Sequence, residues 1–403
     1  DYYASRGLGD VYKRQLLVWI YSIVLKLNDV VGTPIANGTM LLALFQCIFV
    51  TGAGAFLYKT VRHFADQKIA WIAYGFYFIL GGLSAWIMIP YSDSTGIIFP
   101  VFLFWLYVKL KETESAKKKC VLLFLMFFLC YIGFEIKPMA AIVMIAIVAV
   151  EGIHFAGRLL KKQSVWKKSL LAYCLAAVLG LGAAAGGVSA VVGSMHFPVV
   201  TDTVLGWQHH MMLGLNKDTN GGYSQADFDY STSFSSAEEQ HAAELKEIGK
   251  RLKDFGVGGY LQHFVKKSAR NYFDGCFGWG GLGETFYTEI FPERGTVLCS
   301  LIRSLYYDNT EDTLYRYQAL FRQILWYMVL VLVPFSVFTK RPLDKKRQVA
   351  VLSVLGLMLY LQIFEAHARY LYTFVPIFVF LATEGIDNLR EYLNQKSERR
   401  VKK

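Results

Sequence analysis

Long apolar runs alternate with short polar turns through most of the chain, and this pattern predicts membrane-spanning helices. A helix that crosses a bilayer needs about 20 mainly apolar residues. Nine segments approach that length: residues 40–58, 69–89, 95–107, 121–134, 139–155, 170–192, 324–338, 349–364 and 371–383. We therefore expect an all-α polytopic membrane protein with about nine transmembrane helices. An earlier apolar run, residues 16–27, is too short to span and predicts an interfacial helix or the remnant of a lost region.

One polar segment of roughly 125 residues, 196–320, interrupts the apolar pattern and is far longer than an ordinary loop. Ser235 or Ser236 before Glu238 and Glu239 predicts a capped helix start. We expect this segment to form helices on the membrane surface, with no sheet. The predicted organisation is a transmembrane bundle over 16–193, the extracytoplasmic segment over 194–320, further spans over 321–388 and a basic cytoplasmic tail over 389–403.

Basic residues set the orientation. Lys and Arg gather in every second connection, at residues 59–68, 109–119, 158–168, 340–347 and 399–403. Cytoplasmic loops of membrane proteins carry this excess. The intervening turns at 28–39, 90–94, 135–138 and 365–369, together with the long segment, are therefore predicted to be extracytoplasmic. The net charge of +11 then reflects topology rather than nucleic-acid binding, in a chain with 54% hydrophobic and 18% charged residues.

The first fifteen residues have neither an apolar nor an amphipathic pattern, and residues 11–15 resemble translated sequencing-adapter read-through. We expect an artefactual leader on an N-terminally truncated fragment and exclude it from fold arguments. The two cysteines of the long segment, Cys276 and Cys299, could form a disulfide outside the cell or remain free thiols, and both alternatives stay open.

Asp93 opens the third span at its predicted outer end. A carboxylate there suits a general base, a cation ligand or a hydrogen-bond acceptor for a sugar hydroxyl. The alternative is a helix cap, since Asp and Ser residues at a helix start accept backbone N–H bonds. Acidic residues inside a membrane favour the functional interpretation, and acidic residues at helix starts favour the capping one.

Two further outer turns each pair a cation with a carboxylate. Lys137 follows Glu135, and Arg369 follows Glu365 and precedes Tyr370. Either cation could contact a lipid phosphate, and Arg is the stronger candidate because a guanidinium grips phosphate bidentately. The alternative for each is an ion pair with its neighbouring carboxylate.

The long segment holds two more candidate groups. His209 and His210 suit acid–base work or a metal, although adjacent helical residues point in different directions. Asp274, Trp279 and Glu284 combine carboxylates with an aromatic ring, a mixture suited to stacking on sugars. The alternative is an interfacial aromatic belt. A divalent cation is left open.

From residue 16 onward the chain resembles the GT-C glycosyltransferases, in the protein mannosyltransferase and aminoarabinose transferase-like branch with its uncharacterised Gram-positive members. The resemblance rests on the outer-turn phrases Tyr91-Ser92-Asp93, Ile136-Lys137-Pro138 and Glu365 to Tyr370. Phrases of the long segment add to it: Gly214-Leu215-Asn216, Thr219-Asn220-Gly221-Gly222-Tyr223, and Asp274-Gly275 followed by Trp279-Gly280.

This resemblance implies a multi-pass protein of the bacterial plasma membrane with an extracytoplasmic active face. It would move a sugar from a polyprenyl-phosphate donor to a cell-envelope glycan or protein. Asp93 matches the family's second acidic position, and Lys137 and Arg369 match its lipid-phosphate contacts. The family's key acid lies in the first outer loop, which we expect to precede this sequence. A transporter or flippase of lipid-linked saccharides and an inactive envelope scaffold remain as rival functions.

Overall fold

The structure is a computed structural model that describes residues 15–31, 38–162, 169–195, 205–281, 296–307, 314–338 and 343–401. All regular elements within these ranges are helical. Eight helices are long and apolar enough to cross a membrane, and they confirm the predicted all-α polytopic class. They are formed by α3 (Gly38–Phe64), α5 with α6 (Ser92–Gly96, Ile98–Glu112), α7 (Ala116–Ile136), η3 with α8 (Pro138–Ala140, Ala141–Leu160), α9 (Ser169–Gly193), α15 with η5 (Leu314–Leu332, Val333–Ser336), α16 (Lys345–Ile363), and η6 with α17 (Ala368–Phe374, Val375–Val401).

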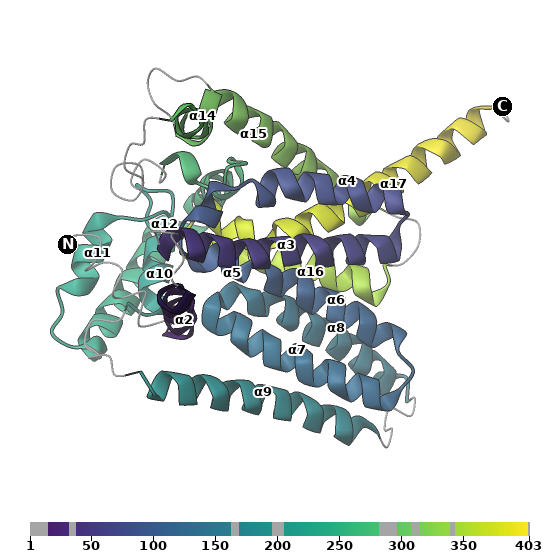
Figure 1. Cartoon of the computed structure of the whole chain (residues 1–403), viewed down its shortest axis with the longest axis horizontal. Coiled ribbons are helices and arrows are strands. Elements are labelled where there is room, and N and C mark those ends of the chain that lie inside the picture. The colour runs from purple at the N-terminus through teal and green to yellow at the C-terminus, as the bar shows by residue number, and fades with distance from the viewer. Residues whose placement is uncertain are drawn as a thin grey trace.

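The span expected at residues 69–89 is interrupted. α4 (Gln67–Tyr77) runs back beside α3 and continues into one π turn, η1 (Phe78–Gly82), before a separate 3-10 turn, η2 (Ala85–Met88) (Figure 1). The carbonyls freed by this break find donors. Arg322 donates to Leu80 and Leu83 at 2.8 and 2.9 Å. Such partners are required wherever a helix breaks inside a membrane.

The first described helix, α2 (Gln15–Val31), is too short to join the spanning set. Figure 1 shows it end-on, crossing the direction of α3 and α7. Its apolar side packs against α3, α7 and α9, and the hydroxyls of Tyr21 and Thr95 lie 2.9 Å apart. This orientation agrees with the predicted interfacial helix.

The first half of α17 lies at the centre of the bundle. Ile377, Phe378 and Phe380 expose 2% of their surface or less, and Trp326 of α15 is fully buried against Phe378. A helix that is apolar on every side must be enclosed by others. The first half of α17 is therefore the central helix around which the other spans pack. Its last turns extend from the bundle (Figure 1).

The two ends of the bundle differ in their polar groups. At the end that we call the basic end, Glu151 receives ion pairs from Lys111 and Lys345 at 2.5 and 2.9 Å. At the opposite end, here called the site end, the turns that carry Asp93, Lys137 and Arg369 meet. The alternation of basic and non-basic connections in the sequence thus matches their separation in space.

The described part of the long segment folds into four helices, α10 (Trp207–Gly214), α11 (Gln225–Thr232), α12 (Ala237–Tyr272) and α14 (Val297–Tyr306). Ser236 caps α12 and accepts a hydrogen bond from the Glu239 amide, as predicted. Figure 1 shows α10, α11 and α12 gathered beyond one end of the bundle. α10 and α12 contact α16, and α12 also contacts η6, so the segment adjoins the site end.

Candidate functional site

Three charged side chains from distant turns meet at the site end. Lys137 Nζ lies 2.6 Å from Asp93 Oδ1, and Arg369 Nε lies 3.6 Å from Asp93 Oδ2. Each carboxylate oxygen thus faces one cation. Asp93 is 1% exposed, so water contributes little to its solvation and the two cations must stabilise its charge. The three residues that the sequence nominated separately form one cluster.

Local backbone geometry places Lys137. α7 ends at Ile136, Lys137 adopts an extended conformation (φ −148°, ψ 103°), and Pro138 starts the next turn. The residue before a proline favours this extended region. On the opposite side, a Cβ added to Gly96 would lie 3.0 Å from the Lys137 Cβ. The glycine therefore permits the close approach that brings the lysine to Asp93.

The Arg369 guanidinium is held by aromatic rings. Its Cζ lies 5.3 Å from the Trp86 ring centroid and 5.0 Å from that of Tyr91, distances typical of cation–π contacts. Arg369 Nε has no hydrogen-bond partner, and the side chain is 21% exposed. Of the two cations, Arg369 is therefore the one that a ligand can reach.

The alternative of cation–carboxylate pairs within each turn is not what the structure shows, because both cations pair between turns. Arg369 pairs with Asp93 rather than with Glu365, and Tyr91 rather than Asp93 stands at the N-cap of α5. Lys137 also turns to Asp93, while Glu135 lies half-buried in the last turn of α7. A buried carboxylate needs cations in place of the water that it has lost. Cations from distant turns can take that position as well as cations that are close in sequence.

Glu365 forms a second polar group beside this cluster. Its Oε2 accepts a hydrogen bond from Tyr370 at 3.0 Å and lies 3.6 Å from His210 Nδ1. Burial opposes ionisation, but the contacts with His210, His367 and Tyr370 hold the pKa of Glu365 below its usual value. The Tyr370 ring also lies under Lys137 Nζ, 5.0 Å away, and so joins the two groups. His210 and Tyr370 thus reach the site, as expected.

Two residues that the sequence did not nominate also belong here. His367 Nδ1 accepts the Arg369 amide at 3.1 Å, and burial together with the Arg369 charge lowers the pKa of His367 to about 4. Lys267 of α12 is fully buried and donates to the Gly214 and Gln362 carbonyls at 2.8 and 2.9 Å. Burial lowers the pKa of Lys267 to about 7. Lys267 therefore fastens α10 and α12 to the end of α16.

Asp274 and Trp279 support the site from behind instead of presenting sugar-binding groups. Asp274 accepts the Cys276 and Gly278 amides at 2.7 and 2.5 Å, which fixes its own loop. Trp279 is 3% exposed and packs edge-on against Trp86, with ring centroids 5.3 Å apart. The sequence predicted sugar contacts for these two residues because Asp, Trp and Gly also occur together in rigid loops like this one. Glu284 lies outside the described residues.

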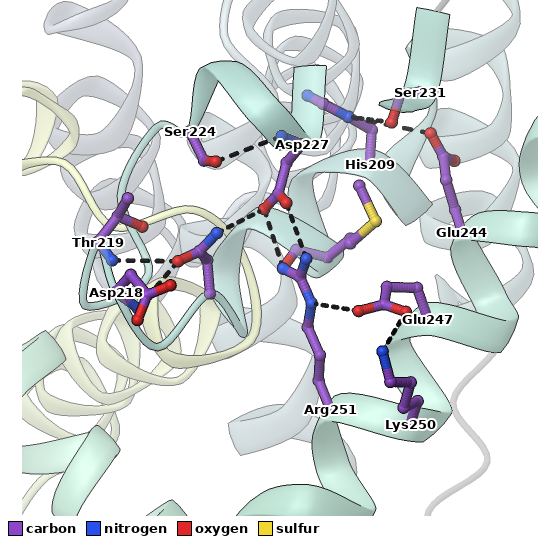
Figure 2. A network of polar contacts seen from close by, with 12 residues as sticks. His209, Asp218, Thr219, Ser224, Asp227, Ser231, Glu244, Glu247, Lys250 and Arg251 are labelled. Atoms are coloured by element: carbon purple, nitrogen blue, oxygen red, sulfur yellow. Dashed lines mark hydrogen bonds and ion pairs between the residues drawn. The ribbon is translucent and has the colours of Figure 1, made fainter. Parts of the chain in front are cut away.

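His209 is separated from His210 in function, as their adjacency on a helix predicted. It is buried in a polar network that joins α10, α11 and α12, where its Nδ1 lies 2.7 Å from the Ser231 hydroxyl (Figure 2). Asp227 and Arg251 form the two-pronged centre of this network at 2.7 and 2.9 Å. The network stabilises the segment and does not reach the charged cluster.

Neither cysteines nor a metal site add to the cluster. Cys276 and Cys299 are both free thiols, and burial raises the pKa of Cys276 to about 11. Among the described residues, no group of three or more His, Cys, Asp or Glu side chains has the geometry of a metal site. The charged groups that remain for chemistry are the two cations, Lys137 and the partly exposed Arg369, and the Glu365 carboxylate.

Comparison with known families agrees with the membrane architecture. Residues 22–388 match the model of a family described as "conserved hypothetical integral membrane protein". The chain belongs to this family. No curated protein and no solved structure matches it. Membership extends from α2 to the middle of α17 and therefore includes every residue of the charged cluster.

Proposed function

We propose that this integral membrane protein is a glycosyltransferase that moves a sugar from a polyprenyl-phosphate donor to a cell-envelope acceptor on the extracytoplasmic face. The observation that carries the proposal is the pair of cations, Lys137 and Arg369, fixed around one buried carboxylate at the site end. When the bond between sugar and phosphate breaks, negative charge collects on the departing phosphate. Cations already in place stabilise that charge without reorganising.

Arg369 is the phosphate contact in this proposal. Its guanidinium is reachable, its Nε lacks a hydrogen-bond acceptor, and Trp86 and Tyr91 hold its position. Lys137 is 3% exposed and lies behind it, so it contributes charge more than direct contact. A guanidinium can hold two phosphate oxygens at once, a geometry that leaves the third to carry the sugar.

Asp93 acts as a positioning residue, because each of its oxygens faces a cation. Glu365 is the better candidate for acid–base work among the described residues. It is ionised near neutral pH, and only its Oε2 is engaged by Tyr370 and His210. In the transfer, an acceptor hydroxyl oxygen bonds to the anomeric carbon, its proton passes to the base, and the bond from carbon to phosphate oxygen breaks.

A transfer assay in lipid nanodiscs tests the proposal. The full chain and its Arg369→Ala, Arg369→Lys and Arg62→Ala variants would be incubated with a panel of radiolabelled polyprenyl-phosphate hexoses and pentoses and with cell-envelope extract. We expect transfer by the parent and by Arg62→Ala, whose exposed arginine contacts only the Ala65 carbonyl at the other end. Arg369→Ala should lose at least 100-fold, in line with removal of one transition-state donor.

Arg369→Lys should recover only part of the activity, because an ammonium keeps the charge and loses the two-pronged grip. Equal transfer by Arg369→Ala and the parent would overturn the phosphate role. Movement of a labelled lipid-linked sugar across vesicles, without any new glycosidic bond, would instead identify the rival flippase activity.

A further inference from the structure

A cavity of about 300 Å³ lies in the long segment, away from the charged cluster. One wall is the loop that follows α10, residues 215–220, and the other is α12. α12 bends at Gly256, which has φ +56° and ψ −176°, a conformation open to glycine. The bend lets Arg251 and Asp254 on one side and Gln262 and Lys266 on the other line the same space.

The polar groups of this cavity are free to bind. Six side chains in its lining have no hydrogen-bond or ion-pair partner within the described ranges: Lys217, Asp218, Asn220, Asp254, Gln262 and Lys266. Two ammonium groups are matched by two carboxylates, so the free charges cancel and an anionic ligand gains little. Two amides add both donors and acceptors. This mixture suits a ligand with many hydroxyl groups and no net charge.

One side of the cavity is aromatic and apolar. The Phe255 and His263 rings lie 4.7 Å apart, and Leu215 is 3% exposed. His263 Nε2 lies 2.9 Å from the Gly214 carbonyl, which can only accept, so Nε2 carries the proton. Burial lowers the pKa of His263, which keeps the ring neutral and leaves Nδ1 as a buried acceptor without a partner. His263 is 3% exposed, so it closes the wall behind Phe255, and Phe255 provides the half-buried aromatic surface.

We propose that this cavity binds a neutral saccharide, with C–H groups of the sugar on the Phe255 ring and hydroxyls on Asn220, Gln262 and Lys266. Ligand pockets of this size combine such an apolar surface with a few polar groups that set orientation.

The loop that forms one wall of the cavity continues, beyond the lining residues, to the turn that carries Glu365. Gly221 accepts the Ala366 amide at 2.7 Å, and the Gly214 carbonyl accepts both His263 and Lys267. A saccharide bound here therefore contacts a loop whose next residue, Gly221, is hydrogen-bonded to Ala366, the neighbour of Glu365. Its identity as the acceptor of sugar transfer rests on the function proposed above, whereas binding itself does not.

The test is direct binding of the detergent-purified full chain to an array of immobilised neutral oligosaccharides built from hexose and N-acetylhexosamine units. We expect at least one glycan to bind, and Gln262→Ala and Lys266→Ala each to weaken that binding roughly three- to tenfold. Lys253→Ala is the matched control, because Lys253 is an exposed lysine of the same helix outside the cavity. Both targeted side chains are exposed, so neither variant should disturb folding.

Absence of binding to every glycan would overturn the proposal, as would equal binding by Gln262→Ala, Lys266→Ala and the parent. Displacement of the glycan by millimolar inorganic phosphate would also overturn it and assign the cavity to an anion. Arg369→Ala should bind the glycan like the parent. Loss of transfer by Arg369→Ala with glycan binding intact would support the enzymatic proposal, and unchanged transfer would contradict it, without affecting the saccharide proposal.

Discussion

Lys137 Nζ lies 2.6 Å from Asp93 Oδ1, and both side chains are almost closed to solvent, with 4% and 1% of their surface exposed. The two residues are 44 positions apart: Asp93 lies at the start of one span, and Lys137 lies in the turn between the next two. An ion pair in such a place cannot be replaced by water if one partner is lost. This relationship makes the pair the most sensitive feature of the site end.

Lys137→Met should therefore destabilise the protein strongly, because it removes the nearer of the two cations that face the buried Asp93 carboxylate. Removing one partner of a buried pair costs about 3 to 5 kcal/mol. Thermal unfolding in one detergent would measure the loss as a lower Tm. The double variant Asp93→Asn/Lys137→Met should regain part of it, since the uncompensated charge is gone.

Lys109→Met is the matched control for that measurement. Lys109 pairs with Glu112 at the basic end but is 43% exposed, so its loss should cost no more than about 1 kcal/mol. Similar Tm values for Lys137→Met and Lys109→Met would contradict a desolvated pair.

Trp86→Leu should weaken donor binding without removing any charge. The Trp86 ring supports the Arg369 guanidinium at 5.3 Å, and cation–π contacts contribute about 0.5 to 2 kcal/mol. Affinity for a radiolabelled polyprenyl-phosphate sugar, measured in a filter-binding assay that does not depend on tryptophan fluorescence, should fall by roughly two- to thirtyfold. Trp71→Leu serves as the control, since Trp71 is 55% exposed and packs on Tyr58. Equal losses in the two variants would argue against a specific role for Trp86.

Lys267 should make stability depend on pH between about 7 and 10.5. The folded protein releases the lysine proton near pH 7, whereas the unfolded chain keeps it up to its ordinary value of 10.5. Between these values the unfolded state binds more protons, so the free energy of unfolding rises with pH by up to about 1.4 kcal/mol per unit. Below pH 7 both states are charged and the full cost of burial remains.

A Tm series from pH 6 to 9.5 would show this rise, and Lys267→Met should flatten it. Lys253→Met, an exposed neighbour on α12, should leave the slope unchanged. A slope that persists in Lys267→Met would assign the effect to another group.

Arg251→Met should loosen the long segment without disturbing the bundle. Arg251 grips Asp227 with two nitrogens and also bonds the Met212 carbonyl, so it joins α10, α11 and α12 (Figure 2). We expect a loss of about 3 kcal/mol. Hydrogen exchange of the full chain should accelerate in these three helices and stay constant in α7 and α8. Lys250→Met, whose side chain is 66% exposed, should change neither.

The spans and the site-end residues were predictable because two strong signals coincide in this sequence. Apolar runs give the helices, and basic clusters in alternate connections give the sides. These two signals place Asp93, Lys137 and Arg369 on the same side of the membrane, and in the structure the three side chains meet. Their partners were not predictable. The same lysine, arginine and acidic residues could form ion pairs within one turn or between distant turns. Only the packing of the helices decides which ion pairs form.

Lys267 shows the other limit of the sequence. It stands among Lys253, Lys266 and Arg270 on a helix that reads as amphipathic and solvated, yet it is fully buried while Lys266 is exposed. The bend at Gly256 resets the helix face, so periodicity counted across it assigns the wrong side. The break after α4 was hidden for a similar reason, because the π turn at Phe78–Gly82 is as apolar as the helix before it.

The cluster at the site end also constrains how the protein is made. Asp93 and Lys137 are made early in synthesis, but Arg369 follows Lys137 by 232 residues, a delay of about 12 to 46 s at ordinary translation speed. The contact between Asp93 and Lys137 involves only segments made before that point, so its formation does not depend on the last span. Arg369 joins this pair only when the last span is made, and it completes the cluster at the site end.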